Sequence, residues 1–476
     1  MALIDLNTLT IADAKKALHD KDISARELVG MYAEEIKKKD KGVHAYLEVF
    51  DDAFERAQEI DERLASGAEP RVLEGVPFAI KDNMLIRGKH ASAASNILEP
   101  YIASYDAYVV EKLRDAGAVF LGRTNMDEFA MGSSTEHSAF GPTKNPHDTK
   151  RVPGGSSGGS AAAVSAGMAL AALGSDTGGS IRQPAAFCGV VGMKPTYGAV
   201  SRSGLIAMAS SLDQIGPLTG TVNDAELIYN VIRGKDEKDA TTVSSKEHAK
   251  KEKLVIGIPK EYGLDTELVD ADMKDVWMRA REVLEKEGHI TKEVSLPYTS
   301  YALPLYYVIM PAEVSSNLAR FDGVRYGFSH KGKNLLEMYE ESRSKGFGGE
   351  AQRRILLGTY ILSAGYYDAY YARAQKVRAR FIADFKRVFG EVDMLLTPTT
   401  PSPAFAFGEK SDDPVKMYAS DIFTVSANLA GVPALSVPFG TGERNGATLP
   451  FGMQLIAPWF GEPMLFDAGK ALERYN

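Results

Sequence analysis

The sequence predicts an α/β fold, and three observations support that class. Short apolar segments alternate with helical segments along the whole chain, which is the pattern of a sheet packed against helices. One stretch contains a β-α-β unit, with strands at 254–259 and 290–296 on either side of an amphipathic helix at 270–287. Such a unit favours parallel pairing of its strands. The chain has 476 residues, 44% of them hydrophobic and 25% charged, so it can bury a large core.

Residues 1–70 are predicted to form N-terminal helices. Thr10 and Asp13 are placed to cap a short first helix. Ser24 and Glu27 form a capping box, in which each side chain can bond to the other's main chain. The apolar residues that follow Ser24 recur on one helical face, so a second helix is expected there.

The central part of the chain, 71–230, alternates strands and helices. A short apolar strand ends at Lys81, and a helix at 106–116 leads into a strand at 118–121. The run 161–173 is predicted to be a helix of small residues that is buried on all sides.

The C-terminal half is predicted to complete the same single domain, 1–476. The stretch 234–253 is polar and highly charged without apolar periodicity, so a solvated surface connection is expected. Within 254–476, the region 301–389 is mainly helical and rich in Tyr and Arg. The remaining predicted elements are strands at 393–396, 434–437 and 453–456 and a helix at 421–430.

Two glycine-serine turns, 154–160 and 177–180, lie in the most apolar part of the chain. Flexible linkers of this composition normally have polar or charged neighbours, whereas buried glycines mark sharp turns or close approaches. The main-chain N–H groups of Thr177, Gly178, Gly179 and Ser180 could converge on one point, as an oxyanion hole requires. A serine beside them could act as a nucleophile, so this segment is the predicted active site.

Several other kinds of site are disfavoured by the sequence. The glycine turns lack the lysine of a phosphate-binding loop and the spacing of a dinucleotide-binding loop. A G-x-S-x-G match occurs at 154–158, but the downstream histidines lie in polar surroundings, which argues against a histidine triad. Cys188 lies in an apolar, strand-like run and is predicted to be a structural cysteine. The eight histidines form no metal-binding pattern.

Bulk properties restrict the partners and the location of the protein. A net charge of −8 argues against a nucleic-acid surface on this chain alone. The apolar run 161–173 is too short to cross a bilayer, and the N-terminus lacks the pattern of a secretory signal. The single cysteine fits a reducing compartment. No membrane association and a cytoplasmic location are therefore expected.

Lys81 directly follows an apolar run instead of lying among other lysines. A lysine at the end of a strand could simply reach solvent. Alternatively, burial could lower its pKa until the neutral amine acts as a base. On the residues alone the two interpretations have about equal support, and the second would complete a triad of two serines and a lysine.

The motifs at 154–160, 174–184 and 76–83 together resemble the amidase signature family. The resemblance implies an amidase-signature fold: a large, mixed, mostly parallel sheet with helices on both faces. It implies that Ser180 attacks an amide carbon, that Ser156 bridges to Lys81, often through a cis peptide, and that Lys81 is the base. These three residues place the catalytic core in 71–230. Asp176 and Arg182 flank the oxyanion turn and are expected to hold it from behind.

Further motifs at 125–146, 210–217 and 316–327 resemble one branch of that family, the A subunits of glutamyl-tRNA(Gln)/aspartyl-tRNA(Asn) amidotransferases. The branch implies that the chain hydrolyses glutamine and passes ammonia to partner subunits, B and C, in a heterotrimer. This chain would bind no cofactor and no metal, because the partner would use ATP and Mg²⁺ and contact most of the tRNA.

The branch also implies residues that bind the substrate. An arginine of the Arg353–Arg354 pair would bind the α-carboxylate, with Arg354 selected, and Asp421 would bind the α-amino group. A tyrosine of the 306–307 pair would line the pocket, with Tyr307 selected. The loop residues expected to contact substrate are Met131, Gly132 and Ser133.

Two positions depart from the branch pattern. His137 stands where the branch usually has asparagine and His147 where it usually has tryptophan, which leaves the triad untouched but changes loop contacts. The chain also ends slightly earlier than the branch pattern, so a clipped C-terminus is one expectation. A free-standing amidase acting on other carboxamides and a scaffold protein with a decayed triad remain the alternatives. The intact triad argues against a scaffold, and the Arg354–Asp421 pair argues against a general amidase.

Overall fold

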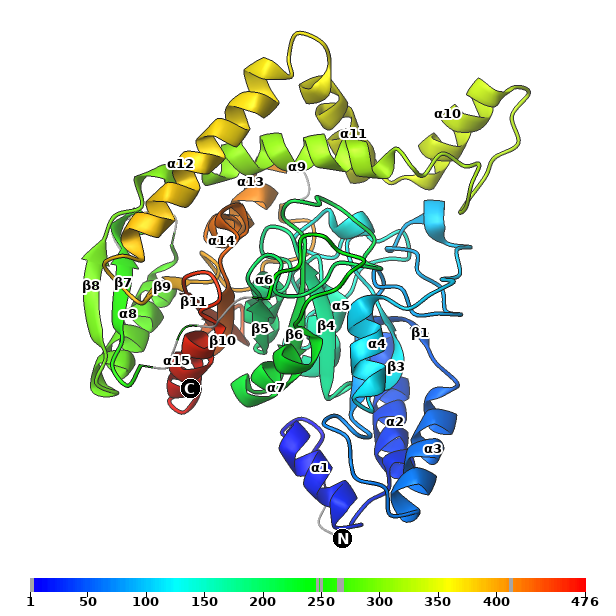
Figure 1. The fold of residues 1–476 in the computed structure, drawn as a ribbon, viewed down its shortest axis with the longest axis vertical. Helices are drawn as coiled ribbons and strands as arrows, with labels where there is room; N and C mark the ends of the chain where they lie inside the picture. The colour runs from blue at the N-terminus through cyan, green and yellow to red at the C-terminus, as the bar shows by residue number, and fades with distance from the viewer. Residues whose placement is uncertain (1–3, 245–247, 249–250, 263–268, 411–413) are drawn as a thin grey trace.

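The computed structural model describes the chain except for residues 1–3, 245–247, 249–250, 263–268 and 411–413. Its centre is a single sheet of eleven strands, and Figure 1 shows helices flanking this sheet. The order of the strands is β1-β3-β2-β4-β6-β5-β10-β11-β9-β7-β8. This confirms an α/β fold with a large mixed sheet.

The strands have the following bounds: β1 Tyr46–Val49, β2 Pro77–Lys81, β3 Val119–Thr124, β4 Ala171–Asp176, β5 Val191–Lys194, β6 Gln214–Thr219, β7 Val255–Pro259, β8 Ile290–Val294, β9 Met394–Pro398, β10 Ala434–Arg444 and β11 Ala447–Ile456. The expectation of mostly parallel pairing is wrong. Among the described strands, β2–β3, β2–β4, β7–β8 and β7–β9 are parallel, and the other pairings are antiparallel. The cause is a hairpin, β10–β11, and the antiparallel strands β5 and β6 in the middle of the sheet, which a single β-α-β unit could not reveal.

The helices have the following bounds: α1 Ile11–His19, α2 Ala25–Val43, α3 Ala53–Ala65, α4 Tyr108–Asp115, α5 Gly158–Ser165, α6 Arg182–Cys188, α7 Val222–Ile232, α8 Ala271–Lys286, α9 Ala302–Leu318, α10 Leu335–Gly346, α11 Gly349–Leu362, α12 Arg373–Val388, α13 Pro414–Tyr418, α14 Val425–Ala430 and α15 Glu462–Glu473. Short 3₁₀ segments lie at η1 Asn96–Leu98, η2 Glu128–Ala130, η3 Lys260–Tyr262, η4 Pro297–Tyr301 and η6 Ala419–Asp421, and a π-helical segment at η5 Asp368–Ala372. None of the helices that the structure describes is long and apolar enough to cross a bilayer.

The predicted N-terminal caps are present. Thr10 accepts a hydrogen bond from Asp13 N at the start of α1. At the start of α2, Ser24 and Glu27 make both bonds of the capping box. Local chemistry was sufficient to predict these helix starts.

The predicted helix 161–173 is wrong in its second half. Helix α5 ends at Ser165, and Gly167 follows with φ of +66°, a left-handed conformation that glycine adopts without strain. The chain then enters β4, which is buried between β2 and β6. A run of small apolar residues suits a buried helix and a buried strand equally well, so periodicity could not separate the two.

One smaller expectation needs correction and another holds in part. Cys188 ends helix α6 and does not lie in a strand. The predicted surface connection 234–253 is mostly exposed among its described residues, but Asp236 and Asp239 are buried and accept hydrogen bonds from Ser201 Oγ and Arg202 N. Five residues of that stretch lie outside the described residues.

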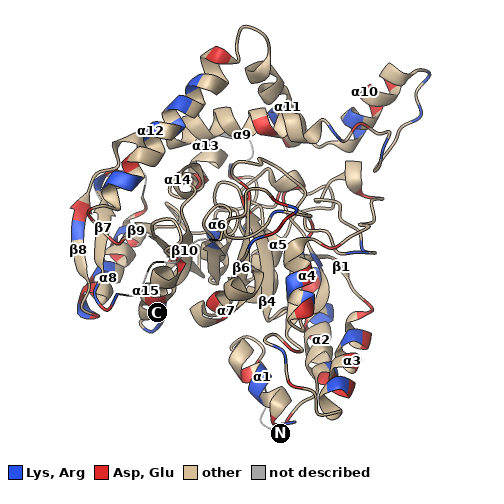
Figure 2. Ribbon diagram, viewed as in Figure 1, with Lys and Arg blue, Asp and Glu red and all other residues tan. Residues whose placement is uncertain are grey.

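The region 301–389 forms a helical layer, as predicted. Helix α9 packs against α11, α12 and α14, and in Figure 1 α9, α11 and α12 lie along the top of the molecule with α14 beneath them. Figure 2 shows that charged residues gather on outer helices such as α2, α3, α8 and α12, whereas the central strands carry few. The charged residues buried at the sheet are therefore exceptional, and they lead to the candidate site.

Candidate active site

Lys81 is the last residue of β2 and is completely buried. Its Nζ lies 2.7 Å from Ser156 Oγ, 2.8 Å from Ser157 Oγ and 2.9 Å from Ser175 Oγ. Burial lowers the pKa of Lys81 from 10.5 to about 7, although nearby aspartates oppose the shift. The side chain does not reach solvent, and the lowered pKa favours the neutral amine far more than in an exposed lysine.

Ser156 contacts this lysine, and Ser180 lies on the neighbouring segment of the chain. The Gly155–Ser156 peptide bond is cis, as the resemblance implied. The main-chain N–H of Ser157 donates to Ser180 O at 3.1 Å, which fixes the two segments against each other. Ser156 is fully buried and Ser180 is 8% exposed, so Ser180 is the outermost of the three predicted triad residues.

The turn 177–180 has the properties of an anion-binding turn. Within the part of the chain that the structure describes, no acceptor is paired with the main-chain N–H of any of its four residues. Both glycines are sterically required. A Cβ at Gly178 would lie 2.9 Å from Tyr306 Oη, and one at Gly179, where φ is +146°, would lie 2.2 Å from Thr424 Oγ1. The turn therefore has free donors in a backbone shape that larger residues would disturb.

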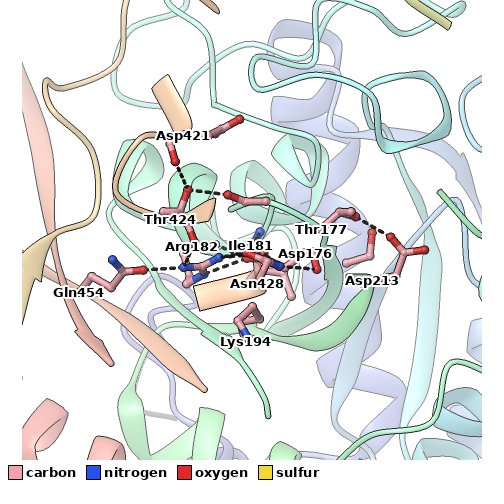
Figure 3. A network of polar contacts seen from close by, with 12 residues as sticks. Asp176, Thr177, Ile181, Arg182, Lys194, Asp213, Asp421, Thr424, Asn428 and Gln454 are labelled. Carbon is pink, nitrogen blue, oxygen red and sulfur yellow. Dashed lines mark hydrogen bonds and ion pairs between the residues drawn. The ribbon is translucent and has the colours of Figure 1, made fainter. Parts of the chain in front are cut away.

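A buried ion pair lies behind the turn, as drawn in Figure 3. Arg182 and Asp176 are both 0% exposed, with Nη2–Oδ1 at 2.9 Å and Nε–Oδ2 at 3.0 Å. Burial alone would raise the pKa of Asp176, but the Arg182 charge lowers it to about 2. Asp176 Oδ2 also accepts from Ile181 N at 3.1 Å, which holds the residue after Ser180.

Asp213 and Thr424 hold the same turn, and the sequence alone did not single them out. Thr177 Oγ1 donates to Asp213 Oδ1 at 2.8 Å (Figure 3), and Thr424 Oγ1 donates to Gly178 O at 2.6 Å. Burial raises the pKa of Asp213 to about 6. These contacts come from the residue before β6 and from the segment before α14, so they depend on the tertiary fold.

The loop 131–133 meets Asp421 on the other side of the turn. Ser133 Oγ donates to Asp421 Oδ2 at 2.6 Å, and a Cβ at Gly132 would lie 2.3 Å from Asp127 Cγ. Met131, like Asp421, is buried, and burial raises the pKa of Asp421 to about 7. The structure thus brings together Ser133 and Asp421, two residues 288 positions apart.

Arg354 is the buried member of its pair. It is 4% exposed, whereas the side chain of Arg353 is 56% exposed. Arg354 Nε donates to Glu350 Oε1 at 2.8 Å, and the guanidinium lies over the rings of Tyr307 at 5.7 Å and Tyr418 at 5.4 Å. Tyr307 therefore contacts the arginine, while its neighbour contacts the oxyanion turn, so both tyrosines belong to the site.

The alternatives set aside from the sequence remain unsupported. Cys188 is buried, and burial raises the pKa of its thiol well above the usual range. His147 Nε2 lies 3.0 Å from Cys188 O, a structural contact. The described residues contain no group of three or more potential metal ligands. A surface hollow of about 1420 Å³ between the N-terminal helices contains none of the predicted site residues.

Comparisons with known proteins agree with this geometry. The amidase family model matches residues 27–466. The glutamyl-tRNA(Gln) amidotransferase A subunit of Carboxydothermus hydrogenoformans is 54% identical over 480 residues, covering 99% of this chain and 98% of the relative. The chain belongs to the amidase family, in the branch formed by the A subunits of glutamyl-tRNA(Gln) amidotransferases.

Other members of the amidase family support the same placement. The corresponding protein of Sulfurihydrogenibium sp. is 51% identical over 98% of this chain and 97% of its own length. The crystal structure of the A subunit from Thermotoga maritima has a TM-score of 0.81 and 43% identity, covering 100% of this chain and 96% of that one. The overall fold is therefore shared as well as the sequence.

Within this amidase-family site, the sequence analysis missed several buried contacts. Ser157 and Ser175 lie as close to Lys81 as Ser156 does, and Asn83 Nδ2 donates to Ser175 Oγ at 2.9 Å. Gln183 contacts two loops at once. All four lie inside the motifs that identified the site, but a linear motif does not indicate which of its serines face the lysine.

Proposed function

We propose that this chain is the glutamine-hydrolysing component of a glutamyl-tRNA(Gln) amidotransferase. The observation that carries the proposal is the contact of the buried Lys81 amine with Ser156, in a chain that matches amidotransferase relatives over almost its whole length. In this proposal Ser180 is the nucleophile, Ser156 the bridge and Lys81 the base.

The proton moves in both directions during one cycle. Ser180 Oγ gives its proton to Ser156 Oγ as Ser156 gives its own to neutral Lys81, and the Ser180 oxygen bonds to the amide carbon of glutamine. The carbonyl oxygen becomes negative and is held by the N–H groups of Thr177, Gly178, Gly179 and Ser180. The C–N bond then breaks, and Lys81 returns the proton through Ser156 to the departing ammonia. Water attacks the glutamyl ester by the same relay and frees glutamate.

The low pKa of Lys81 makes this relay possible near neutral pH. An exposed lysine with a pKa of 10.5 would be almost entirely protonated and could not accept a proton. Burial lowers the pKa to about 7, near the value at which a general base is most effective.

The selection of glutamine is assigned to charges at its amino-acid end. Arg354 would bind the α-carboxylate. Its Nε donates to Glu350 and its Nη1 to Met310 Sδ at 3.7 Å, so Nη2 is the guanidinium nitrogen for which the described residues supply no hydrogen-bond partner. Asp421 would bind the α-amino group, held in place by Ser133. Met131, Gly132 and Tyr307 would complete the pocket.

Ammonia release implies a partner that consumes it. We assign partner subunits B and C to a heterotrimer with this chain, in which the partners use ATP and Mg²⁺ and bind most of the tRNA. The net charge of −8 on this chain fits that division. The chain itself would need no cofactor, and its place would be the cytoplasm.

The test is ammonia release from glutamine by the full chain purified with its partner subunits. Ser180→Ala is expected to abolish release, whereas Ser165→Ala, which changes a partly exposed serine on α5, should leave it unchanged. ATP and glutamyl-tRNA should raise the rate. Hydrolysis of a simple aliphatic amide by the lone chain, indifferent to tRNA, would instead indicate a free-standing amidase. Failure of Ser180→Ala to lower release would refute the proposed nucleophile.

A further inference from the structure

The side chain of Gln183 is completely buried three residues after Ser180, at the start of α6. It carries no charge, and the relay proposed above gives it no step. Its carboxamide nevertheless makes a hydrogen bond at each end. Oε1 accepts from Gly155 N at 2.9 Å, and Nε2 donates to Ser133 O at 2.9 Å.

The first bond fixes the segment that carries the bridging serine. Gly155 directly precedes Ser156. The segment is tightly packed on the glutamine, because a Cβ at Gly154 would lie 2.4 Å from Gln183 Oε1. A shift of this carboxamide would therefore move the main chain next to Ser156.

The second bond fixes the loop that holds Asp421. The carbonyl oxygen of Ser133 accepts a hydrogen bond from Gln183 Nε2, and the Ser133 hydroxyl donates to Asp421 Oδ2 at 2.6 Å. The same glutamine is also tied to the oxyanion turn, since its main-chain N–H donates to Gly179 O at 2.8 Å. One residue thus contacts the bridging segment, the substrate loop and the oxyanion turn.

We infer that Gln183 is a positioning residue that couples the Ser133 loop to the Ser156 segment, so that the amino-acid end and the amide of glutamine are held in register. The inference rests on the proposed function, because it assigns Asp421 to the substrate amino group. Gln183 does not touch the reacting atoms. It sets the position of groups that do.

The substitution Gln183→Glu distinguishes the effect of the bond to Ser133 O from the effect of the bond to Gly155 N. A carboxyl oxygen can still accept from Gly155 N. A protonated carboxyl can also donate to Ser133 O, but an ionised carboxylate accepts only and would face that carbonyl without a proton. Burial raises the pKa of such a carboxyl, so ionisation is expected within the range in which the enzyme can be assayed.

Other charged groups near this position also respond to pH. Asp127 lies beside Gly155, Asp421 is bonded to Ser133, and Arg182 and Asp176 pair on the inner side of α6. Since these groups are shared by the variant and the parent, the useful quantity is the ratio of their KM values for glutamine. This ratio should be near one at low pH and rise about tenfold as pH increases, the loss expected when a buried carbonyl loses its donor. The kcat should stay within about threefold.

Gln183→Met removes both bonds at similar side-chain length. It should raise KM and also lower kcat about tenfold or more, because the Ser156 segment is released as well. Rates are expressed per active site, titrated with a serine-reactive fluorophosphonate, so that partial misfolding does not enter the comparison. Gln352→Glu is the matched control, because Gln352 Nε2 also donates to a main-chain carbonyl, Phe347 O, at 2.7 Å.

The experiment uses the full chain in complex with its partner subunits. A pH-dependent KM ratio in Gln183→Glu, absent from Gln352→Glu, is the expected result. A KM for glutamine that matches the parent at every pH in both Gln183 variants would overturn the inference. Absence of Ser180-dependent ammonia release in the parent enzyme would instead overturn the proposed function, and the two failures are therefore distinct.

Discussion

The clearest prediction for a single residue concerns Lys81, because burial lowers its pKa to about 7, close to neutral pH. Only the neutral amine can accept a proton. We therefore expect kcat for glutamine hydrolysis to rise with pH through about 7 and then level off. Lys81→Met should lower kcat about 10³-fold. Lys194 is the matched control, a second buried lysine whose pKa is lowered by burial to about 7 and whose amine is bonded to Val432 O at 2.6 Å.

Lys194→Met is expected to lower the melting temperature but to keep the pH dependence of the surviving active sites. A pH profile without an inflection near 7 in the parent enzyme would contradict the assignment of Lys81 as the base.

Asp421 provides a second prediction from a single carboxyl group. Burial raises its pKa to about 7, and only the carboxylate can pair with a substrate ammonium. The KM for glutamine should therefore fall as pH rises through about 7. Asp421→Asn should raise KM about tenfold or more and remove this pH dependence, as measured by steady-state ammonia release. The KM for a glutamine analogue that lacks the α-amino group should not change in Asp421→Asn. Equal increases in KM for glutamine and for this analogue would contradict the assignment.

Individual site residues could be predicted from the sequence where a residue type was unusual among its neighbours. Lys81 followed an apolar run, and the structure buries it against Ser156 as the resemblance implied. The choice of Arg354 over Arg353 agrees with the burial of Arg354 and the exposure of Arg353. The binding of the substrate α-carboxylate by Arg354 stays a prediction. Asp213 could not be found from the sequence, because its contact with Thr177 exists only after β4 and β6 pair.

At the scale of elements, the oxyanion turn depends on glycine. Gly179→Ala should lower kcat at least about 10²-fold, because φ is +146° and the new Cβ would meet Thr424. Gly446→Ala is the control, since Gly446 also has a positive φ, +80°, but no atom lies within 4 Å of a Cβ there. The control should lose only about 1 kcal/mol of unfolding free energy. Similar kcat values for the two variants would contradict a dependence on close packing at the turn.

Element boundaries were predictable where capping chemistry marks them and not where burial decides. Thr10 and Ser24 start helices because their side chains satisfy main-chain donors. The run 161–173 has no such marker. Its second part became β4 because the strand is buried between two neighbours, information that belongs to the tertiary fold.

For the whole molecule, the Asp176–Arg182 pair joins parts of the chain that are far apart. Arg182 Nη1 donates to Gln454 Oε1 at 2.6 Å on β11 and to Thr424 O at 3.0 Å (Figure 3). Asp176→Asn would leave a buried guanidinium without its counter-charge, so we expect a loss of about 3–5 kcal/mol of unfolding free energy. Denaturant titration measures this. Lys292→Gln removes an exposed pair with Glu391 and should cost less than about 1 kcal/mol.

The same pair sets an acid limit on stability. The pKa of Asp176 is lowered to about 2 in the fold, below its ordinary value of 3.8. The unfolded chain therefore binds this proton first as pH falls. The contribution of the pair to the free energy of unfolding is present above about pH 4 and is lost as pH falls toward 2. In Asp176→Asn this pH dependence should be absent between about pH 4 and 2, because the group no longer titrates.

The topology of the whole sheet was only partly predictable. The β7-α8-β8 unit is parallel as expected, since a helical crossover leaves little choice. The antiparallel pairs β10–β5 and β4–β6 join strands through connections without such a rule. Local patterns thus predicted the class and several of the elements, whereas the pairing at the centre required the three-dimensional structure.

The central claim is that Ser180 carries the glutamyl group during turnover. The most direct test is rapid acid quenching of the full enzyme during glutamine hydrolysis, followed by peptide mass spectrometry. We predict a glutamyl ester on the peptide containing Ser180 that is absent from Ser180→Ala. A glutamyl adduct on Ser156 or Cys188, or steady ammonia release from Ser180→Ala, would contradict the account.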